Sequence, residues 1–495
     1  MSLIEGKNLT FSYDGSPDPV FEDLSFRIDT DWRLGLIGRN GRGKTTLLRL
    51  FLGEEAGRGS ITGLPSLAYY PCPVSEDETG RDAARRELRE EPDWRLEREL
   101  GLLKLSPELL DRPFSTLSGG ERAKLLLAVL FLREGDWPLI DEPTNHLDLE
   151  GRETAADYLR RKRGFLLVSH DRAFLDRCVD HVLILPRAGG AEVERGNFSS
   201  WWENRRRRDA FEQGENEKRK KEIRQLSAAA KRTADWSDQV EKTKFATKNS
   251  GLRPDRGYIG HKSAKLMKRS KAMEDRRSAA VEERVGLLKN VETAQPLKLH
   301  PLDYRARTLC ELRDVSPQYN GRPVGPPVTF TVERGDRIAL RGPNGSGKSS
   351  LLKLLAGAEL DHDGLVRRGG GLVVSVVPQD AGALAGDLSQ LAAEARIDES
   401  LFKTVLRTLD FSRALFERDA GSYSEGQKKK VLLARSLCQR ADLYLWDEPM
   451  NYIDVFSRMQ IEDLLLEYPP TLVCVEHDEA FCKRVATRTV EVERG

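Results

Sequence analysis

Two stretches of the chain show the same succession of apolar runs and helical patterns. LGLIG at 34–38 and RIALRG at 337–342 each end in a glycine-rich loop, and TTLLRLFL or SSLLKLLAG then follows with apolar residues at helical spacing. This pattern predicts a strand, a loop and a helix in that order. Further apolar runs, LLVSHD at 166–171 and LYLWDEP at 443–449, end in polar residues. We therefore expect an α/β fold with buried strands.

Four motifs recur in one order, each 304 to 307 residues further along the chain. One offset shared by four motifs predicts a duplicated domain. The pairs are GRNGRGKT at 38–45 with GPNGSGKS at 342–349, LSGGE at 117–121 with YSEGQ at 423–427, IDEPTNHLD at 140–148 with WDEPMNYID at 446–454, and SHD at 169–171 with EHD at 476–478.

The segment between the copies has a different pattern. Good helix formers dominate it, and a cluster of Gly251, Pro254, Gly257 and Gly260 interrupts them. We expect a long helical hairpin, with helices at about 201–248 and 262–292. The predicted organisation is therefore an α/β domain at 1–200, a helical linker at 201–300 and a second α/β domain at 301–495.

Positive charge is concentrated in this linker. The whole chain has a net charge of +1, but residues 201–300 hold 26 basic and 15 acidic side chains, a net of +11. Between Lys242 and Lys271 there are ten basic residues and one acidic residue, Asp255. A solvated hairpin with no partner is the alternative, but such a run repels itself unless an anion meets it. We expect a polyanionic partner.

Composition excludes two other classes of protein. No run of about 18 apolar residues is present, so no membrane span is expected, and the first residues lack the pattern of a signal peptide. The six cysteines are scattered without framework or metal-like spacing, which is typical of reduced thiols. We expect a cytoplasmic protein without a C-terminal extension.

The repeated G-x-x-G-x-G-K-[ST] pattern is typical of a phosphate cradle. Backbone N–H groups of such a loop point at phosphate oxygens, and the following helix favours an anion at its N-terminus. A glycine turn without a ligand is the alternative, but the matching downstream motifs in both copies argue against it. The residues predicted to bind ATP here are Gly38, Asn40, Gly41, Gly43, Lys44, Thr45, Thr46, Gly342, Asn344, Gly345, Gly347, Lys348, Ser349 and Ser350.

Acidic residues and histidines follow the later strands. Asp141 and Asp447 suit Mg²⁺, together with the hydroxyls that follow the loop lysines. Glu142 and Glu448 suit the polarisation of an attacking water. A lone histidine is usually structural, but these two recur at one place, and we expect them to sense the γ-phosphate. The predicted catalytic residues are Glu142, Glu448, His170 and His477, and the predicted metal ligands are Thr45, Asp141, Ser349, Gln379 and Asp447.

Serine-glycine motifs and two tyrosines complete the candidate sites. The serines begin helical patterns, so they suit a helix cap and equally a γ-phosphate held by the other copy. The tyrosines are candidates for stacking on adenine, with ordinary strand packing as the alternative. These further ATP-binding candidates are Ser118, Gly119, Gly120, Ser424, Gly426, Tyr13, Tyr319 and Gln379.

This set of motifs closely resembles that of ABC ATPases. Two such domains in one chain, with a charged linker and no membrane span, resemble the ABC-F subgroup over essentially the whole sequence. The resemblance implies a monomer whose domains form a head-to-tail sandwich around two ATP molecules with Mg²⁺. It also implies that the ATP-bound protein binds the ribosome and that the linker reaches, through the E site, large-subunit rRNA near the peptidyl-transferase centre.

The two copies are not equally regular. ABC domains usually carry a glutamine where the second copy has Gln379, but the first copy has Cys72. The second signature has Glu425 where the first has Gly119. We therefore expect two unequal ATP sites.

The stretch DRGYIGHKSAKLMKRSK at 255–271 resembles the Lsa-type branch of ABC-F proteins. That branch protects ribosomes from lincosamides, streptogramin A and pleuromutilins. Basic side chains would contact RNA phosphates, and aromatic rings could stack on bases. The predicted RNA-binding residues are Arg253, Arg256, Tyr258, His261, Lys262, Lys265, Lys268, Arg269 and Lys271.

Three alternatives remain open. A housekeeping ABC-F translation factor, acting on stalled or initiating ribosomes, would share the whole architecture. The ATPase half of a membrane exporter fits poorly, because the two domains are fused and carry a basic hairpin in place of a transmembrane partner. A DNA-repair ATPase of related fold would carry much longer insertions.

Overall fold

The computed structural model describes most of the chain. The described residues are 2–13, 19–88, 93–145, 147–185, 190–243, 298–319, 321–382, 384–409, 411–412 and 415–493. They divide into one compact unit, Met1–Trp201 with Gln295–Gly495, and a second unit, Trp202–Ala294. The predicted second linker helix, its loop and all nine predicted RNA-binding residues lie outside the described residues.

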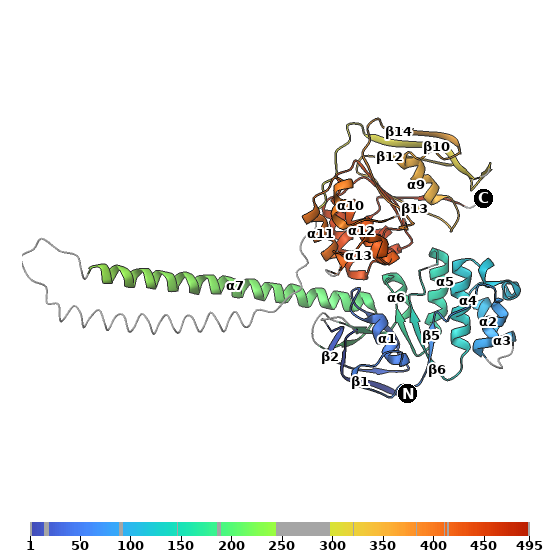
Figure 1. The fold of residues 1–495 in the computed structure, drawn as a ribbon, viewed down its shortest axis with the longest axis horizontal. Coiled ribbons are helices and arrows are strands. Elements are labelled where there is room, and N and C mark those ends of the chain that lie inside the picture. Colours follow the sequence, from blue (N-terminus) through green and yellow to red (C-terminus); the bar gives the residue numbers. More distant parts are fainter. Residues whose placement is uncertain are drawn as a thin grey trace, which may run out of the picture. The chain divides into compact units, whose positions relative to one another are not determined.

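The first copy combines an antiparallel and a mainly parallel sheet (Figure 1). The antiparallel sheet has the order β2 (Phe21–Asp29), β1 (Leu3–Phe11), β4 (Arg58–Thr62). The larger sheet has the order β5 (Ser66–Tyr70), β6 (Asp136–Asp141), β7 (Phe165–Val168), β3 (Arg33–Ile37), β8 (His181–Ile184), β9 (Glu192–Arg195), of which only β9 pairs antiparallel.

The second copy repeats this arrangement. Its antiparallel sheet has β10 (Thr308–Tyr319) between β12 (Val328–Glu333) and β14 (His362–Arg368), with the short β11 (Arg322–Pro323) at one end of β10. Its parallel sheet has the order β15 (Val374–Val377), β16 (Leu443–Asp447), β17 (Leu472–Val475), β13 (Arg337–Arg341), β18 (Arg488–Glu491). The five parallel strands therefore have the same spatial order in both copies, which confirms the duplication.

Helices cover the parallel sheets and carry the motifs. Each phosphate loop leads into one helix, α1 (Lys44–Leu52) or α9 (Lys348–Ala356), and each signature into another, α4 (Gly119–Leu132) or α12 (Glu425–Cys438). The remaining α-helices of the two copies are α2 (Gly80–Leu88), α3 (Asp93–Leu102), α5 (Leu149–Arg160), α6 (Arg172–Cys178), α10 (Leu388–Glu394), α11 (Glu399–Thr408), α13 (Val455–Glu467) and α14 (Glu479–Val485).

The central parallel strands β7 and β17 are apolar along their whole length because both faces are covered. In the second copy, Ile338 and Leu340 of β13 pack with α9 in one core, whereas Ala339 faces the core beneath α12 and α13. Alternate side chains of a strand point to opposite faces, so a doubly covered strand must be apolar throughout. Polar residues are therefore confined to the ends of the buried strands, as with Asp141 at the end of β6 and Asp447 at the end of β16.

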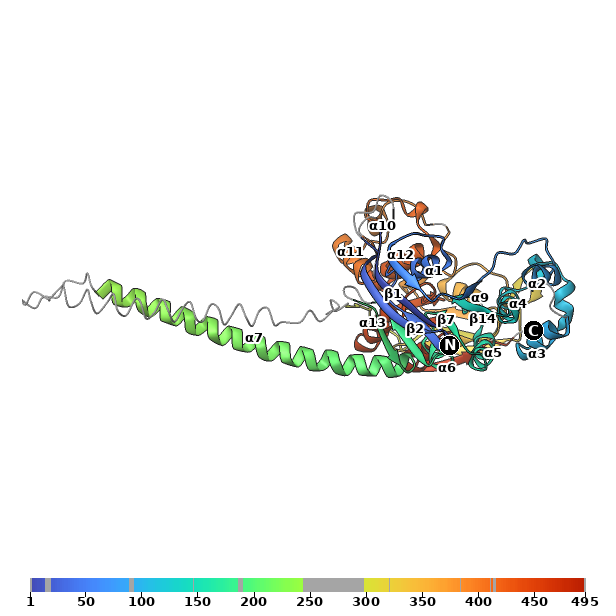
Figure 2. The same ribbon diagram turned by 90° about the horizontal axis from the view of Figure 1, so that it is seen from below.

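The first linker helix is α7 (Phe198–Thr243), 46 residues long (Figure 2). It begins three residues before the predicted start, since Phe198 and Trp201 are buried and the Trp201 ring lies 5.9 Å from that of Phe456. At 1.5 Å per residue, α7 is roughly 70 Å long. The limits 1–200, 201–300 and 301–495 stay predictions.

Candidate functional site

The two phosphate loops have the same geometry. Gly43 and Gly347 lie at the N-termini of α1 and α9 with φ of 80° and 92°, a left-handed conformation that favours glycine. Lys44 Nζ donates to the carbonyls of Gly38 and Arg39, at 2.7 and 3.2 Å. Each loop therefore closes on its own lysine at the start of a helix, where a phosphate would be bound.

The second lysine repeats the first. Lys348 Nζ donates to the carbonyls of Gly342 and Pro343, at 2.9 and 2.8 Å. Burial lowers the pKa of both loop lysines. Acidic residues oppose this fall, and among them are Asp454 for Lys44 and Asp148 for Lys348, each from the other copy.

The predicted catalytic glutamates share an unusual backbone. Glu142 and Glu448 follow the last residues of β6 and β16 and have φ of 51° and 47°. Non-glycine residues rarely adopt this left-handed conformation, which costs about 1–3 kcal/mol and concentrates at functional sites. The same strain at both positions means that each glutamate is turned out of its strand in the same way.

In the first copy, Asp141 accepts hydrogen bonds from two hydroxyl groups. Asp141 Oδ2 accepts from Thr45 Oγ1 at 3.4 Å and from the Tyr69 hydroxyl at 3.2 Å. Glu142 lies beside His170, whose Nε2 is 3.3 Å from Glu142 Oε1 and whose backbone N–H donates to Oε2. Burial, reinforced by the neighbouring Asp141, raises the pKa of Glu142 to about 8. Burial also lowers the pKa of His170 well below its usual range.

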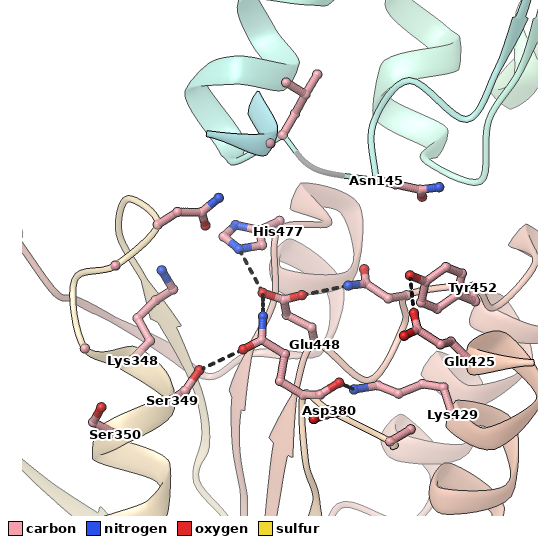
Figure 3. Close-up of a pocket in the computed structure, with 18 of the residues that line it drawn as sticks. Asn145, Lys348, Ser349, Ser350, Asp380, Glu425, Lys429, Glu448, Tyr452 and His477 are labelled. Atoms are coloured by element: carbon pink, nitrogen blue, oxygen red, sulfur yellow. Dashed lines mark hydrogen bonds and ion pairs between the residues drawn. The ribbon is translucent and has the colours of Figure 1, made fainter. Parts of the chain in front are cut away.

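In the second copy, the side chain of Gln379 connects the site. Ser349 Oγ donates to Gln379 Oε1 at 3.5 Å, and Gln379 Nε2 donates to Glu448 Oε1 at 3.1 Å. His477 Nε2 lies 3.7 Å from the same carboxylate oxygen (Figure 3). Burial raises the pKa of Glu448, but His477 and a nearby lysine outweigh it, and the pKa lies below its usual value.

A cavity of about 710 Å³ brings both copies together at the second phosphate loop. Asn344, Gly345, Lys348 and Ser349 of the second copy line it, and so does Gly119 of the first signature. The first copy also contributes Leu147 and Arg152, and Asn145, which is labelled in Figure 3. This placement agrees with the head-to-tail arrangement implied by the resemblance. At the other loop, Asn40 Nδ2 donates to the carbonyl of Tyr452 at 2.9 Å.

Both signature serines act as helix caps. Ser118 accepts from the N–H of Glu121, and Ser424 from that of Gln427, and each pair forms a reciprocal capping box. The capping role is therefore observed. A role in contacting a γ-phosphate remains a prediction for Ser118, Gly120, Ser424 and Gly426.

The two tyrosines occupy equivalent places. The Tyr13 hydroxyl shares a hydrogen bond with Thr46 Oγ1 at 2.9 Å, and the Tyr319 hydroxyl shares one with Ser350 Oγ at 3.0 Å. Their side chains are 40% and 48% exposed, so neither ring is closed into a core. Each ring is fixed beside its phosphate loop, and stacking on adenine stays a prediction.

The oxygen atoms at the second site fit Mg²⁺. Asp447 Oδ1 is buried and lacks a hydrogen-bond partner within the described part of the chain, and Ser349 and Gln379 supply further oxygens nearby. Hard oxygen donors of this kind suit Mg²⁺, which normally adds water and phosphate ligands. The described residues contain no group of three or more His, Cys, Asp or Glu side chains that could bind a metal alone.

Three contributors were missed from the sequence. Tyr69 contacts Asp141, Lys429 lines the cavity, and Asn451 Nδ2 donates to Glu448 Oε2 at 2.7 Å. Asn451 recurs as Asn145 inside a repeated motif, a signal that could have identified it. Tyr69 and Lys429 occur in one copy only, so the repeat gave no signal for them. Cys72, half-buried, takes the place of Gln379 in the first copy.

Comparison with known proteins defines the class. A family model described as ABC transporter matches residues 21–145 and 326–451, so the two phosphate-loop domains are ABC-type domains. Domains of this kind bind ATP with Mg²⁺. Among the described residues, none of the helices has the length and apolar content that crossing a membrane requires.

Similar proteins cover the whole chain. ATP-binding protein Uup of Caulobacter vibrioides is 30% identical over 96% of this chain and 75% of its own length. Ribosome protection protein VmlR of Bacillus subtilis is 29% identical, over 98% and 86%. ABC transporter F family member 5 of Arabidopsis thaliana is 26% identical, over 100% and 75%. The chain belongs to the ABC-F family of ATP-binding proteins.

Solved structures agree on the fold. A structure described as RNase-L Inhibitor has a TM-score of 0.62 at 19% identity and covers 98% of this chain and 87% of its own. The archaeal ribosome recycling factor aABCE1, in complex with the ribosomal stalk protein aP1, has a TM-score of 0.61 at 20% identity over the same shares. At this identity the likeness concerns the fold alone.

Proposed function

We propose that this protein binds and hydrolyses ATP with Mg²⁺ at two sites, one at each phosphate loop. The observation that carries this proposal is the cavity in which Lys348, Ser349 and Glu448 of one copy meet Gly119 of the other. A nucleotide bound there would contact a phosphate cradle and a capped helix N-terminus at once. In this proposal both halves of the sandwich belong to one chain, and the active form is a monomer.

The geometry supports the proposed catalytic roles. Glu142 and Glu448 would polarise the attacking water, and His170 and His477, within 3.3 and 3.7 Å of them, would orient these carboxylates and sense the γ-phosphate. Bound Mg²⁺ would neutralise phosphate charge. Thr45 and Asp141 in the first site, and Ser349, Gln379 and Asp447 in the second, are the residues that would hold it.

We further propose that the ATP-bound protein acts on the ribosome, in the cytoplasm, and protects it from antibiotics. The relative named ribosome protection protein VmlR matches 98% of this chain, linker included. The net charge of +11 at 201–300 suits rRNA. In this proposal the linker enters the E site and its loop approaches the peptidyl-transferase centre, where lincosamides, streptogramin A and pleuromutilins bind.

The first test is drug susceptibility. A drug-sensitive bacterial host expressing the chain should tolerate higher concentrations of one or more of these three classes. Alanine substitutions in 249–261 should change the level or the spectrum of resistance while ATP turnover and ribosome binding persist. Unchanged susceptibility with the unsubstituted chain would contradict ribosome protection.

A second candidate, a housekeeping translation factor, would then take its place. The relative Uup, which matches 96% of this chain, is described only as an ATP-binding protein. The same architecture therefore also occurs in a protein whose name does not mention ribosome protection. Ribosome binding with no effect on drug susceptibility would support this candidate.

The linker charge gives a separate measurement. Replacing Lys262, Lys265, Lys268 and Lys271 with alanine should flatten the salt dependence of ribosome binding. Each lost phosphate contact lowers the slope of log K against log salt by about 0.7–0.9. Affinity for a fluorescent ATP analogue should not change. An unaltered slope would mean that these lysines form only a solvated face.

A further inference from the structure

The second signature helix carries a buried lysine inside the cavity wall. Lys429, on α12, is 2% exposed and lines the cavity together with Lys348 and Glu448. The residue at the equivalent position of the first copy, 306 residues earlier, is Ala123. The second copy therefore has a lysine at this position of its signature helix, where the first copy has an alanine.

All three N–H donors of Lys429 have an acceptor. Its Nζ donates to the carbonyl of Pro378 at 2.7 Å, of Gln379 at 3.3 Å and of Asp447 at 2.7 Å. Lysine has three donors and no acceptor, so this ammonium group is fully used. Figure 3 shows Lys429 reaching from its helix toward the loop that carries Asp380.

These contacts join two parts of the site that are distant in sequence. Pro378 and Gln379 belong to the loop after β15, whereas Asp447 is the last residue of β16. The same loop places the Gln379 side chain between Ser349 and Glu448. Lys429 thus binds the main chain of the residue whose side chain connects the magnesium and water-polarising groups.

Packing alone does not account for this residue. Moving a charged ammonium group out of water costs several kcal/mol unless it gains compensating interactions. Ala123 shows that an apolar side chain fits the equivalent position of the first copy, where it is also buried. The lysine is satisfied by carbonyls and adds one positive charge beside Asp447 and Glu448.

We propose that Lys429 is a positioning residue for the second site. It fixes the Gln379 loop against the end of β16, so that the Gln379 side chain is held ready for Mg²⁺ before nucleotide binds. The first site has Cys72 and Ala123 in place of this pair and lacks the device. The inference rests on the proposed ATP hydrolysis, whose failure the experiment below distinguishes.

The test uses Lys429→Met in the full chain carrying Glu142→Gln, so that only the second site turns over. In the nucleotide-free protein, backbone amides at 378–382 should exchange with deuterium faster than in the parent. The Mg²⁺ concentration for half-maximal binding of a fluorescent ATP analogue should rise about tenfold, as for other losses of metal-supporting contacts. kcat should fall by a similar factor, with KM at saturating Mg²⁺ within about twofold.

Controls separate positioning from general damage. Lys428→Met lies one residue earlier on the same helix, is partly exposed and does not line the cavity, and it should leave all three measurements unchanged. Lys429→Gln, which keeps two donors, should give intermediate values and serves if the methionine variant does not fold. Adding Gln379→Ala should remove most of the effect of Lys429→Met, because both act through one side chain.

The outcomes are distinguishable. Unchanged amide exchange and Mg²⁺ requirement in folded Lys429→Met would overturn the inference and leave ATP hydrolysis intact. Additive effects of Lys429→Met and Gln379→Ala would also overturn it. A parent protein that bound no nucleotide in the presence of Mg²⁺ would instead refute the proposed function.

Discussion

The two nucleotide sites share their loops, strained glutamates and histidines, but they differ in what surrounds the carboxylates. In the second site, Gln379, Asn451 and His477 hold Glu448, and its pKa lies below the usual value. In the first, Glu142 is buried beside Asp141 and its pKa is raised to about 8. The repeat therefore reproduces the geometry of the phosphate loop and varies the hydrogen bonds that support the predicted catalytic carboxylate.

This difference teaches that a duplicated motif does not guarantee a duplicated activity. In the second site the carboxylate of Glu448 accepts two side-chain hydrogen bonds and its pKa is lowered, whereas in the first site Glu142 accepts the backbone N–H of His170 and its pKa is raised. We expect the second site to turn over faster, and the first to respond more strongly to nucleotide and metal.

The largest effect is expected from removing both glutamates. Glu142→Gln with Glu448→Gln should lower ATP turnover by about 10²–10⁴, the range typical of lost general-base assistance. The phosphate loops stay intact, so the protein should retain ATP and remain bound to ribosomes. Phosphate release and co-sedimentation of nucleotide with ribosomes measure both. Rapid nucleotide release with normal turnover would contradict these roles.

The single substitutions break or sharpen the comparison directly. Glu448→Gln should reduce turnover several-fold more than Glu142→Gln, because the better-supported carboxylate contributes more of the rate. Steady-state phosphate release under saturating ATP and Mg²⁺ is the measurement. Identical kinetics for the two variants would remove the claim of unequal sites.

The contact between the copies is unequal as well. Arg172 of α6 makes a bidentate pair with the fully buried Glu462 of α13, and Arg484 also binds Glu462, at 2.9 Å. The residue equivalent to Arg172 in the second copy is Glu479, which pairs with Lys483 on its own helix. Only one of two equivalent positions therefore carries an arginine across to the other copy.

Arg172→Met should destabilise the protein by about 2–3 kcal/mol. Breaking a buried pair costs about 3–5 kcal/mol, and the remaining Arg484 offsets part of that cost. The matched control is Glu479→Gln, whose partly exposed pair should contribute under about 1 kcal/mol. Thermal and urea unfolding measure both variants. An equal loss of stability in both variants would show that the Arg172–Glu462 pair between the copies contributes no more than an exposed pair.

The sequence predicted the motif-bearing helices and strands better than the residues that pack around them. Four repeated motifs were enough to predict both phosphate loops, both carboxylate pairs and both capped helices, because each depends on residues within a few positions of one another. The start of α7 was three residues too late, since Phe198 and Trp201 are recruited by packing against the body. Local helix preference does not report such packing.

Tyr69 and Lys429 were missed for a related reason. Tyr69 reads as an ordinary strand residue, and its role appears only when β5 pairs in parallel with β6 and places its hydroxyl 3.2 Å from Asp141. Lys429 reads as one of three consecutive lysines on an exposed helix. Lys429 and Lys430 are buried and Lys428 is not, and this is decided by which face of α12 covers the sheet, a tertiary property.

The smallest effect is expected from Tyr69, a residue of the first site that has no counterpart in the second. Tyr69 donates to Asp141 Oδ2, the oxygen that also accepts from Thr45. A valine, Val376, stands at the equivalent position of the second copy, where Gln379 is available instead. Tyr69 therefore supports the predicted metal carboxylate Asp141 from a strand, while Gln379 contacts Ser349 and Glu448 from a loop.

Tyr69→Phe should raise the Mg²⁺ concentration needed for ATP-analogue binding at the first site by about two- to fivefold. The hydrogen bond is 3.2 Å long, so we expect it to contribute in the lower part of the usual net range of about 0.5–1.5 kcal/mol. The measurement uses a chain that also carries Glu448→Gln and Lys348→Ala. The first of these should remove turnover at the second site and the other should weaken nucleotide binding there, so that the first site is observed alone. Tyr70→Phe, the buried neighbour on β5, is the matched control and should have no effect on the Mg²⁺ requirement. An equal response to both substitutions would mean that the Tyr69 hydroxyl serves strand packing, and that the first site orients Asp141 through Thr45 alone.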